Sequence, residues 1–214
     1  MQTTRRIRGA GWILIGSGLL WAVAILIEYH FNLKPPNQGT LYAIDQGMFF
    51  VAQLGYVTGV AGLMWAHAAG DGWFGMGALS LFAFGWIVLV VAAPLAWITR
   101  NNNLPLFPIG GLMAMLGGLL AGIAVVAARR WHGLQRFSVL CYALYYLCAL
   151  LLPLFVAHQG PTLITESVWG LAWVPVGVGL VSHARTERTP TPAKRSHGGP
   201  YTGYGAHRGG SQAG

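Results

Sequence analysis

Apolar residues gather into six long runs along the chain, and short polar stretches separate these runs. The runs cover residues 9–27, 41–66, 73–98, 104–128, 137–157 and 163–182. At a rise of about 1.5 Å per residue, each run is long enough to cross about 30 Å of hydrocarbon as an α-helix. The pattern therefore predicts an all-α integral membrane protein, with a six-helix transmembrane bundle formed by residues 1–183.

The first run follows a basic sequence, RRIR, and this order of segments is also typical of secretory signals. Here the apolar stretch is almost as long as a full span. No small-x-small cleavage site follows it, and the chain continues directly into Glu28 and His30. We therefore expect the first run to be a retained membrane helix.

Composition agrees with a membrane protein. Hydrophobic residues make up 55% of the chain and charged residues only 8%, and the mean hydropathy is +0.54. The net charge of +8 does not indicate nucleic-acid binding, because the basic residues lie beside the spans and no recognition fold accompanies them. The lipid bilayer, with anionic lipids at the cytoplasmic face, is the expected partner.

The distribution of lysine and arginine predicts the orientation of the bundle. Six spans place both termini on one side, and that side carries nearly all the positive charge: Arg5, Arg6, Arg8, Arg129, Arg130, Arg136, Arg185, Arg188, Lys194, Arg195 and Arg208. The other side has Lys34 and Arg100. Because positive loops are retained in the cytoplasm during insertion, we expect a multi-pass protein of the cytoplasmic (inner) membrane with both termini cytoplasmic.

The C-terminal stretch, residues 184–214, is basic and rich in glycine and proline. Such a composition buries too little apolar surface to fold alone. We expect a disordered cytoplasmic tail that is held near anionic lipid by its basic residues.

The second span carries polar residues along one face. At about 100° per residue, Tyr42, Asp45, Gln46, Gln53, Tyr56 and His67 fall within one arc of the helix. Glycines occupy the other side at positions 47, 55, 59 and 62, and Gly55 and Gly59 have the small-xxx-small spacing that permits close helix packing. We expect this helix at the centre of the bundle, where its polar face forms either interhelical hydrogen bonds or a hydrated path.

Ionisable residues gather where the predicted spans meet the outer face. Together with the polar stripe they form a candidate site: Glu28, His30, Asp45, Gln46, Gln53, Tyr56, Arg100, His158 and Glu166. Three hypotheses account for it, namely ion pairs that end the helices, the mouth of a pathway, or a metal site built from carboxylate and imidazole ligands.

No zinc motif such as H-E-x-x-H occurs, which makes the metal hypothesis the weakest of the three. The histidines lie at helix ends, where a haem is poorly shielded, and no lysine lies within a span to bind retinal. We therefore expect no cofactor.

Further features bear on packing. Pro94, Pro153 and Pro175 lie in or near the third, fifth and sixth spans and predict kinks, and Cys141 and Cys148 are interpreted as ordinary thiols. An offset of 100 residues aligns Gly18 with Gly118 and Ala24 with Ala124, among other matches, which weakly suggests a 3+3 inverted repeat.

These features favour a non-enzymatic permease for a small solute or ion, which uses the stripe on the second helix and the outer carboxylates. The alternative is an accessory or structural subunit that binds membrane-protein partners or a second copy of the chain. A metal-dependent membrane hydrolase is the third hypothesis.

Overall fold

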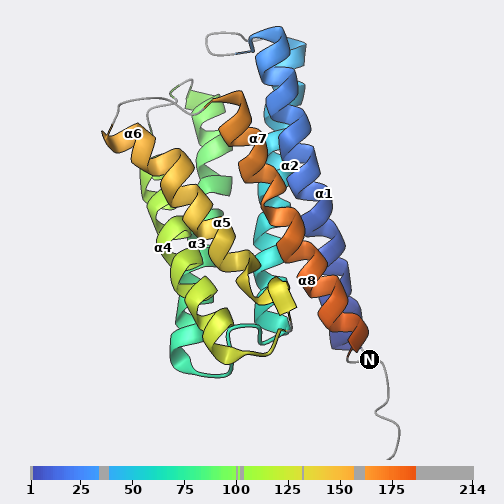
Figure 1. Ribbon diagram of the computed structural model, residues 1–214. Helices are drawn as coiled ribbons and strands as arrows, with labels where there is room; N and C mark the ends of the chain where they lie inside the picture. Colours follow the sequence, from blue (N-terminus) through green and yellow to red (C-terminus); the bar gives the residue numbers. More distant parts are fainter. Residues whose placement is uncertain are drawn as a thin grey trace, which may run out of the picture.

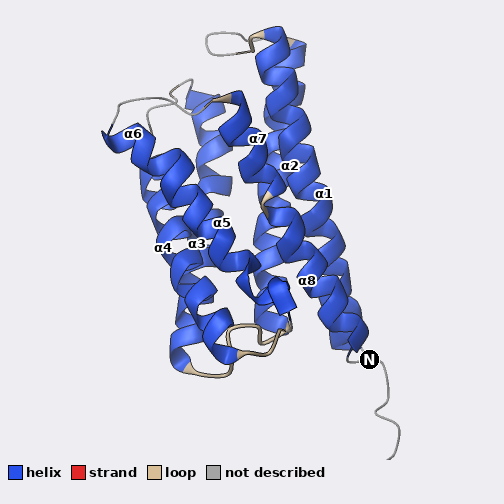
Figure 2. Ribbon diagram, viewed as in Figure 1, coloured by secondary structure: helices blue, strands red, loops and turns tan. Residues whose placement is uncertain are grey.

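The computed structural model describes residues 2–33, 39–99, 101, 104–131, 133–156 and 162–186. Within these ranges the chain is helical apart from short connections, and it contains no strand (Figure 2). The first four helices are α1 (Gln2–Phe31), α2 (Thr40–Trp65), α3 (Trp73–Thr99) and α4 (Leu106–Ala128). A 3-10 helix (Gly133–Phe137) then leads into α5 (Ser138–Tyr145), a π-helix (Tyr146–Leu151), α6 (Leu152–Val156), α7 (Leu163–Leu171) and α8 (Trp173–Thr186).

The structure agrees with the prediction of an all-helical protein with several possible membrane spans. Five helical segments are long and apolar enough to cross a membrane: Gln2–Phe31, Thr40–Trp65, Trp73–Thr99, Leu106–Ala128 and Leu163–Thr186. The predicted span 137–157 is divided between α5, the π-helix and α6, so the count of six spans is not confirmed. The inverted repeat is not confirmed either.

Helix ends differ from the predicted span edges where polar residues continue a helix. α1 begins at Gln2, well before the apolar run, because nothing in its first turns breaks a helix. It ends at Phe31. The next residue, Asn32, has a left-handed φ of 50°, and the Leu33 N–H donates to the Glu28 carbonyl at 2.9 Å. α8 extends to Thr186 and so includes the first three residues of the predicted tail, and residues 187–214 lie outside the described residues.

The proline effects appear in the second half of the chain. α7 and α8 are separated at Ala172, three residues before Pro175, and the π-helix lies directly before the turn that contains Pro153. Proline lacks an N–H donor and its ring displaces the carbonyl four residues earlier, so irregular turns just before it are expected. α3 continues through Pro94.

Two groups of helices make up the bundle (Figure 1). α1 packs along α2, α7 and α8, and α3 packs along α4, which in turn contacts α5. Contacts between the two groups are sparser and run mainly from α2 to α3 and from α5 to α8. The chain therefore forms an α1–α2–α7–α8 group and an α3–α4–α5–α6 group.

Small residues permit the close packing within each group. A Cβ atom added at Gly55 or Gly59 of α2 would meet Ser17 or Leu14 of α1 at under 3 Å. Gly11 and Gly177 likewise meet backbone to backbone between α1 and α8, since each added Cβ would lie within 3 Å of the other's carbonyl oxygen. The predicted glycine face of the second span is thus its contact surface with α1, except that Gly47 has no such neighbour.

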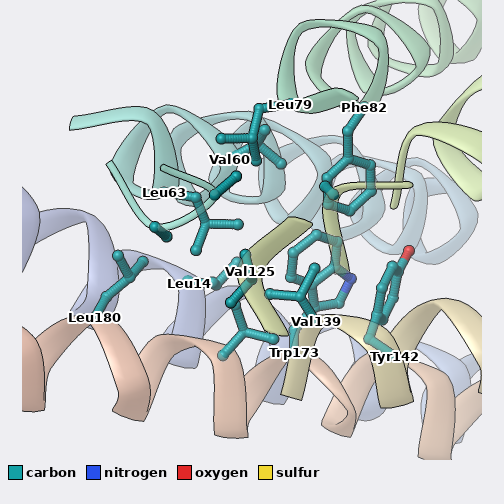
Figure 3. Close-up of a cluster of buried hydrophobic side chains, with 14 of the residues drawn as sticks. Leu14, Val60, Leu63, Leu79, Phe82, Val125, Val139, Tyr142, Trp173 and Leu180 are labelled. Carbon is teal, nitrogen blue, oxygen red and sulfur yellow. The ribbon is translucent and has the colours of Figure 1, made fainter. Parts of the chain in front are cut away.

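Aromatic side chains fill the centre, where the two groups meet. We call this the aromatic cluster, and it comprises Tyr56, Phe82, Trp86, Tyr142, Trp169 and Trp173, all buried. The Trp173 ring stacks on Tyr56 at 4.8 Å between centroids. Phe82 stacks on the same ring at 5.5 Å and Tyr142 lies 4.2 Å from it (Figure 3). Helices from both groups therefore meet at one tightly packed layer.

Candidate functional site

A cavity of about 240 Å³ lies at the end of the bundle where α1 ends and α2 begins, which we call the α1–α2 end. Five helices contribute to its wall, with Trp21, Ile25 and Glu28 from α1, Tyr42, Gln46, Phe49 and Gln53 from α2, Ala93, Ala96 and Trp97 from α3, Phe107 from α4 and Glu166 from α7. We call it the acidic cavity. It lies between the two helix groups.

Its two carboxylates come from helices that are distant in sequence. Glu28 is in the last turns of α1, and Glu166 is in the first turn of α7. A reciprocal cap fixes that turn, since the Thr165 N–H donates to Thr162 Oγ1 at 3.3 Å and the Thr162 N–H donates to Thr165 Oγ1 at 2.8 Å. The α7 N-terminus also favours a negative charge at Glu166 through its dipole.

The amide of Gln53 forms the inner part of the wall. Its side chain is 8% exposed, and within the described part of the chain its Oε1 atom has no hydrogen-bond partner. A buried amide oxygen without a donor costs about 1–3 kcal/mol, so a protein retains one only where something else compensates. This oxygen, on the wall of a cavity with two carboxylates, adds a further acceptor for a donor-rich or positively charged solute.

Asp45 lies beside this wall but is not part of it. The side chain is 0% exposed, its Oδ2 accepts from Gln46 Nε2 at 3.4 Å, and its Oδ1 has no partner among the described residues. Asp45 also interacts electrostatically with Glu28. The α1–α2 end thus concentrates negative charge on one side of the bundle.

Aromatic rings complete the cavity. Trp21 contacts Phe49 edge to face at 4.7 Å, and Trp97, 61% exposed, lies at the rim. Faces of tryptophan and tyrosine rings attract cations, and the attraction strengthens away from water. Carboxylates and aromatic rings therefore both favour a positively charged solute here.

The aromatic cluster closes the cavity toward the other end of the bundle. Trp21 lies 4.7 Å from Trp169 and 5.9 Å from Tyr56, between ring centroids. Tyr56 itself is fully buried, and its hydroxyl donates to the Ser17 carbonyl at 3.5 Å. The polar stripe of α2 is therefore divided: Tyr42, Gln46 and Gln53 line the cavity, whereas Tyr56 belongs to the packed layer.

The remaining predicted site residues lie elsewhere. His30 is exposed, its ring contacts Phe31 at 4.7 Å, and it lines a separate surface hollow with Leu26 and Leu163. Arg100 and His158 lie outside the described residues. Among the residues that the structure does describe, no three His, Cys, Asp or Glu side chains are close enough to hold a metal ion.

Sequence reasoning did not include the aromatic wall in the site. Trp21 was recognisable, since it shares a helix face with Glu28, one of the predicted site residues. Phe107 and Trp97 carried no such signal, because their place at the cavity depends on how α3 and α4 pack against α2.

A second charged cluster lies at the opposite end of the bundle. Asp71, in the connection from α2 to α3, pairs with His67 at 2.8 Å and with the guanidinium of Arg130 beyond α4. The Arg130 guanidinium lowers the pKa of the Asp71 carboxyl below its ordinary value. All three side chains are well exposed, which is typical of a surface ion pair rather than a binding site.

Comparison of the chain with models of protein families, with curated proteins and with solved structures finds no match. The geometry of the acidic cavity is therefore the basis on which a function is assigned.

Proposed function

We propose that this protein is a membrane permease that binds a small organic cation in the acidic cavity. The observation that carries the proposal is the composition of the cavity wall. It combines Glu28 and Glu166 with aromatic rings and with the amide oxygen of Gln53, which has no partner among the described residues. Metal ions prefer a shell of oxygen or nitrogen ligands, which aromatic walls do not supply. An ammonium group with apolar substituents suits both kinds of surface.

The two helix groups suggest how such a solute crosses. Glu28, Gln53 and Glu166 belong to the α1–α2–α7–α8 group, whereas Trp97 and Phe107 belong to the other group. Rocking of one group against the other is a common transport movement, and binding sites lie between the moving units. Passage requires separation of the aromatic cluster, which closes the cavity on the side of Trp21 and Tyr56.

The cavity faces outward in this proposal. Arginines occupy the opposite end of the bundle, at both the start of α1 and the connection after α4, and positive charge is retained in the cytoplasm. The solute thus enters from the outer side, is held by the carboxylates, and is released toward the cytoplasm.

The closed aromatic cluster also favours the alternative, an accessory subunit of a larger membrane complex. Its buried rings stack and contact one another across both helix groups, which a rigid structural role explains equally well. The acidic cavity is what an accessory role leaves unexplained. The hydrolase hypothesis has no support from the described side chains, since no metal-binding group occurs among them.

The experiment is uptake of radiolabelled tetramethylammonium by liposomes that contain the full chain. We expect uptake above that of protein-free liposomes. We expect Glu166→Gln and Gln53→Leu to reduce it by about tenfold or more, because the first removes a negative charge and the second removes a carbonyl dipole that would face the cation. Asp71→Asn is the matched control and should transport normally, since it neutralises a carboxylate at the opposite end.

Wild-type uptake by both cavity variants would show that the cavity is not the pathway. Binding of tetramethylammonium without uptake would instead favour the accessory-subunit alternative.

A further inference from the structure

A groove on the side of the bundle adjoins the acidic cavity. It has a volume of about 230 Å³, lies between α2 and α3, and is lined by Ala43, Gln46, Gly47, Phe50, Ala93, Pro94 and Trp97. We call it the lateral groove. Its wall is almost entirely apolar, and Gln46 supplies its one polar side chain.

The lateral groove and the acidic cavity share part of their walls. Gln46, Ala93 and Trp97 line both. Gly47 and Trp97 are exposed at the bundle surface, in the part of α2 and α3 that the hydropathy places within the membrane. An apolar surface that faces lipid is thus continuous with a chamber that holds two carboxylates.

Glycine at position 47 contributes to the shape of the groove. A Cβ atom added there would meet no other atom within 4 Å, whereas added Cβ atoms at Gly55 and Gly59 would collide with α1. Gly47 is therefore not required for helix packing, and its small size leaves space on the groove side of α2. A larger side chain at this position would occupy that space without disturbing the packing between α1 and α2.

We infer that the solute is an amphipathic cation, whose ammonium group occupies the acidic cavity while its hydrocarbon chain lies in the lateral groove. This inference rests on the proposed function and specifies its substrate class. Glu28, Glu166 and the Gln53 amide oxygen receive the positive head group, and Phe50, Pro94 and Ala93 contact the chain. The shared wall at Gln46 and Trp97 is where head group and chain join. Such a solute reaches the outward-facing cavity through the lateral groove from the outer leaflet of the bilayer, because its chain is already dissolved there.

The test compares two probes, tetramethylammonium and dodecyltrimethylammonium, on the full chain in lipid nanodiscs. The variants are Gly47→Leu, which fills the lateral groove, and Gly16→Leu as the matched control. Gly16 is also an exposed helix glycine with no atom near an added Cβ, but it lies on α1 away from the groove. The control therefore reproduces the change in residue type and in lipid contact.

We expect Gly47→Leu to weaken dodecyltrimethylammonium binding about tenfold, the effect of displacing roughly two buried methylene groups. Tetramethylammonium binding should change less than about twofold, because the head group does not use the groove. Gly16→Leu should bind both probes as the wild type does. Equal binding of the long-chain probe by Gly47→Leu and Gly16→Leu would overturn the inference while leaving the cation site intact.

The charge requirement is tested separately with Glu166→Gln and with dodecanol, an uncharged probe of the same chain length. We expect Glu166→Gln to weaken both cations and dodecanol to bind far more weakly than dodecyltrimethylammonium. The proposed function would be contradicted if tetramethylammonium did not bind and if Glu166→Gln bound dodecyltrimethylammonium as tightly as the wild type. Binding of dodecanol as tight as that of the long-chain cation would show a groove for uncharged lipid and would overturn the amphipathic-cation inference.

Discussion

The carboxylates at the two ends of the bundle differ in their exposure and in their partners. At the end opposite the α1–α2 end, Asp71 is exposed and pairs with His67 and Arg130, so water and two basic groups satisfy it. At the α1–α2 end, Asp45 is fully buried and one of its oxygens has no partner among the described residues, while the half-buried Glu28 and Glu166 line a cavity that is open at the surface. Burial of charge is costly, so the exposed Asp71 pairing needs no function to explain it, whereas the buried Asp45 carboxyl does.

This comparison also bears on the three hypotheses for the candidate site at the predicted outer face, namely ion pairs, a pathway and a metal site. Ion pairing at helix ends describes the Asp71 cluster well, although the sequence pattern drew attention to the other end. The convergence of Glu28, Gln46, Gln53 and Glu166 on one cavity supports the pathway hypothesis. His30, one of the ligands offered for a metal site, does not line this cavity but a separate surface hollow.

The largest effect is expected in a test of which end of the bundle faces the outside of the cell. Single cysteines at His30 and at Leu134, both exposed, are placed in a chain whose Cys141 and Cys148 are serine. We expect an impermeant thiol reagent added to intact cells to label His30→Cys and to leave Leu134→Cys unlabelled, because the arginine-rich end is cytoplasmic. Lysed cells, in which both should react, provide the control, and the reverse pattern in intact cells would invert the topology.

The energetic contrast predicts opposite effects of neutralising the two aspartates. Asp45→Asn should raise the free energy of unfolding by about 1 kcal/mol or more, since it removes a buried charge beside Glu28 while preserving shape. Asp71→Asn should lower stability slightly. Thermal unfolding of both variants in one detergent measures the difference, and a loss of stability in Asp45→Asn would mean that its carboxylate has a partner in the membrane.

The smallest effect concerns pH at the Asp71 cluster. Because Arg130 lowers the pKa of Asp71 in the folded chain, the pairing stabilises the protein above the unfolded-state pKa of this carboxyl and is lost as the pH falls through the lower folded value. Wild type and Asp71→Asn should therefore differ slightly in melting temperature near neutral pH, and the difference should begin to shrink only below about pH 4. High salt should also reduce the difference, since exposed pairs are screened. If the difference in melting temperature between wild type and Asp71→Asn persisted in acid, it would be due to packing rather than to the charge of Asp71.

Much of the fold was predictable from hydropathy. The edges of α2, α3 and α4 lie within two residues of the apolar runs, because long uninterrupted apolar segments have one stable state in a bilayer, the helix. The face of α2 that packs on α1 followed from the positions of Gly55 and Gly59, since close helix packing depends on small side chains. The fifth segment was harder to predict, because the effect of Pro153 on the preceding turn depends on neighbouring helices.

The sequence alone determined that the chain is helical and apolar enough for the membrane, and it identified most of the polar residues that line the acidic cavity. Both results depend on local properties, namely segment hydropathy and the helical period. Tertiary packing decided the rest. It brought Glu166 of α7 to Glu28 of α1, placed Trp97 and Phe107 on the same wall, and enclosed Tyr56 among aromatic rings. Which residues line a cavity and which fill a core depends on how helices distant in sequence pack together, and helical periodicity within one segment carries no information about its neighbours.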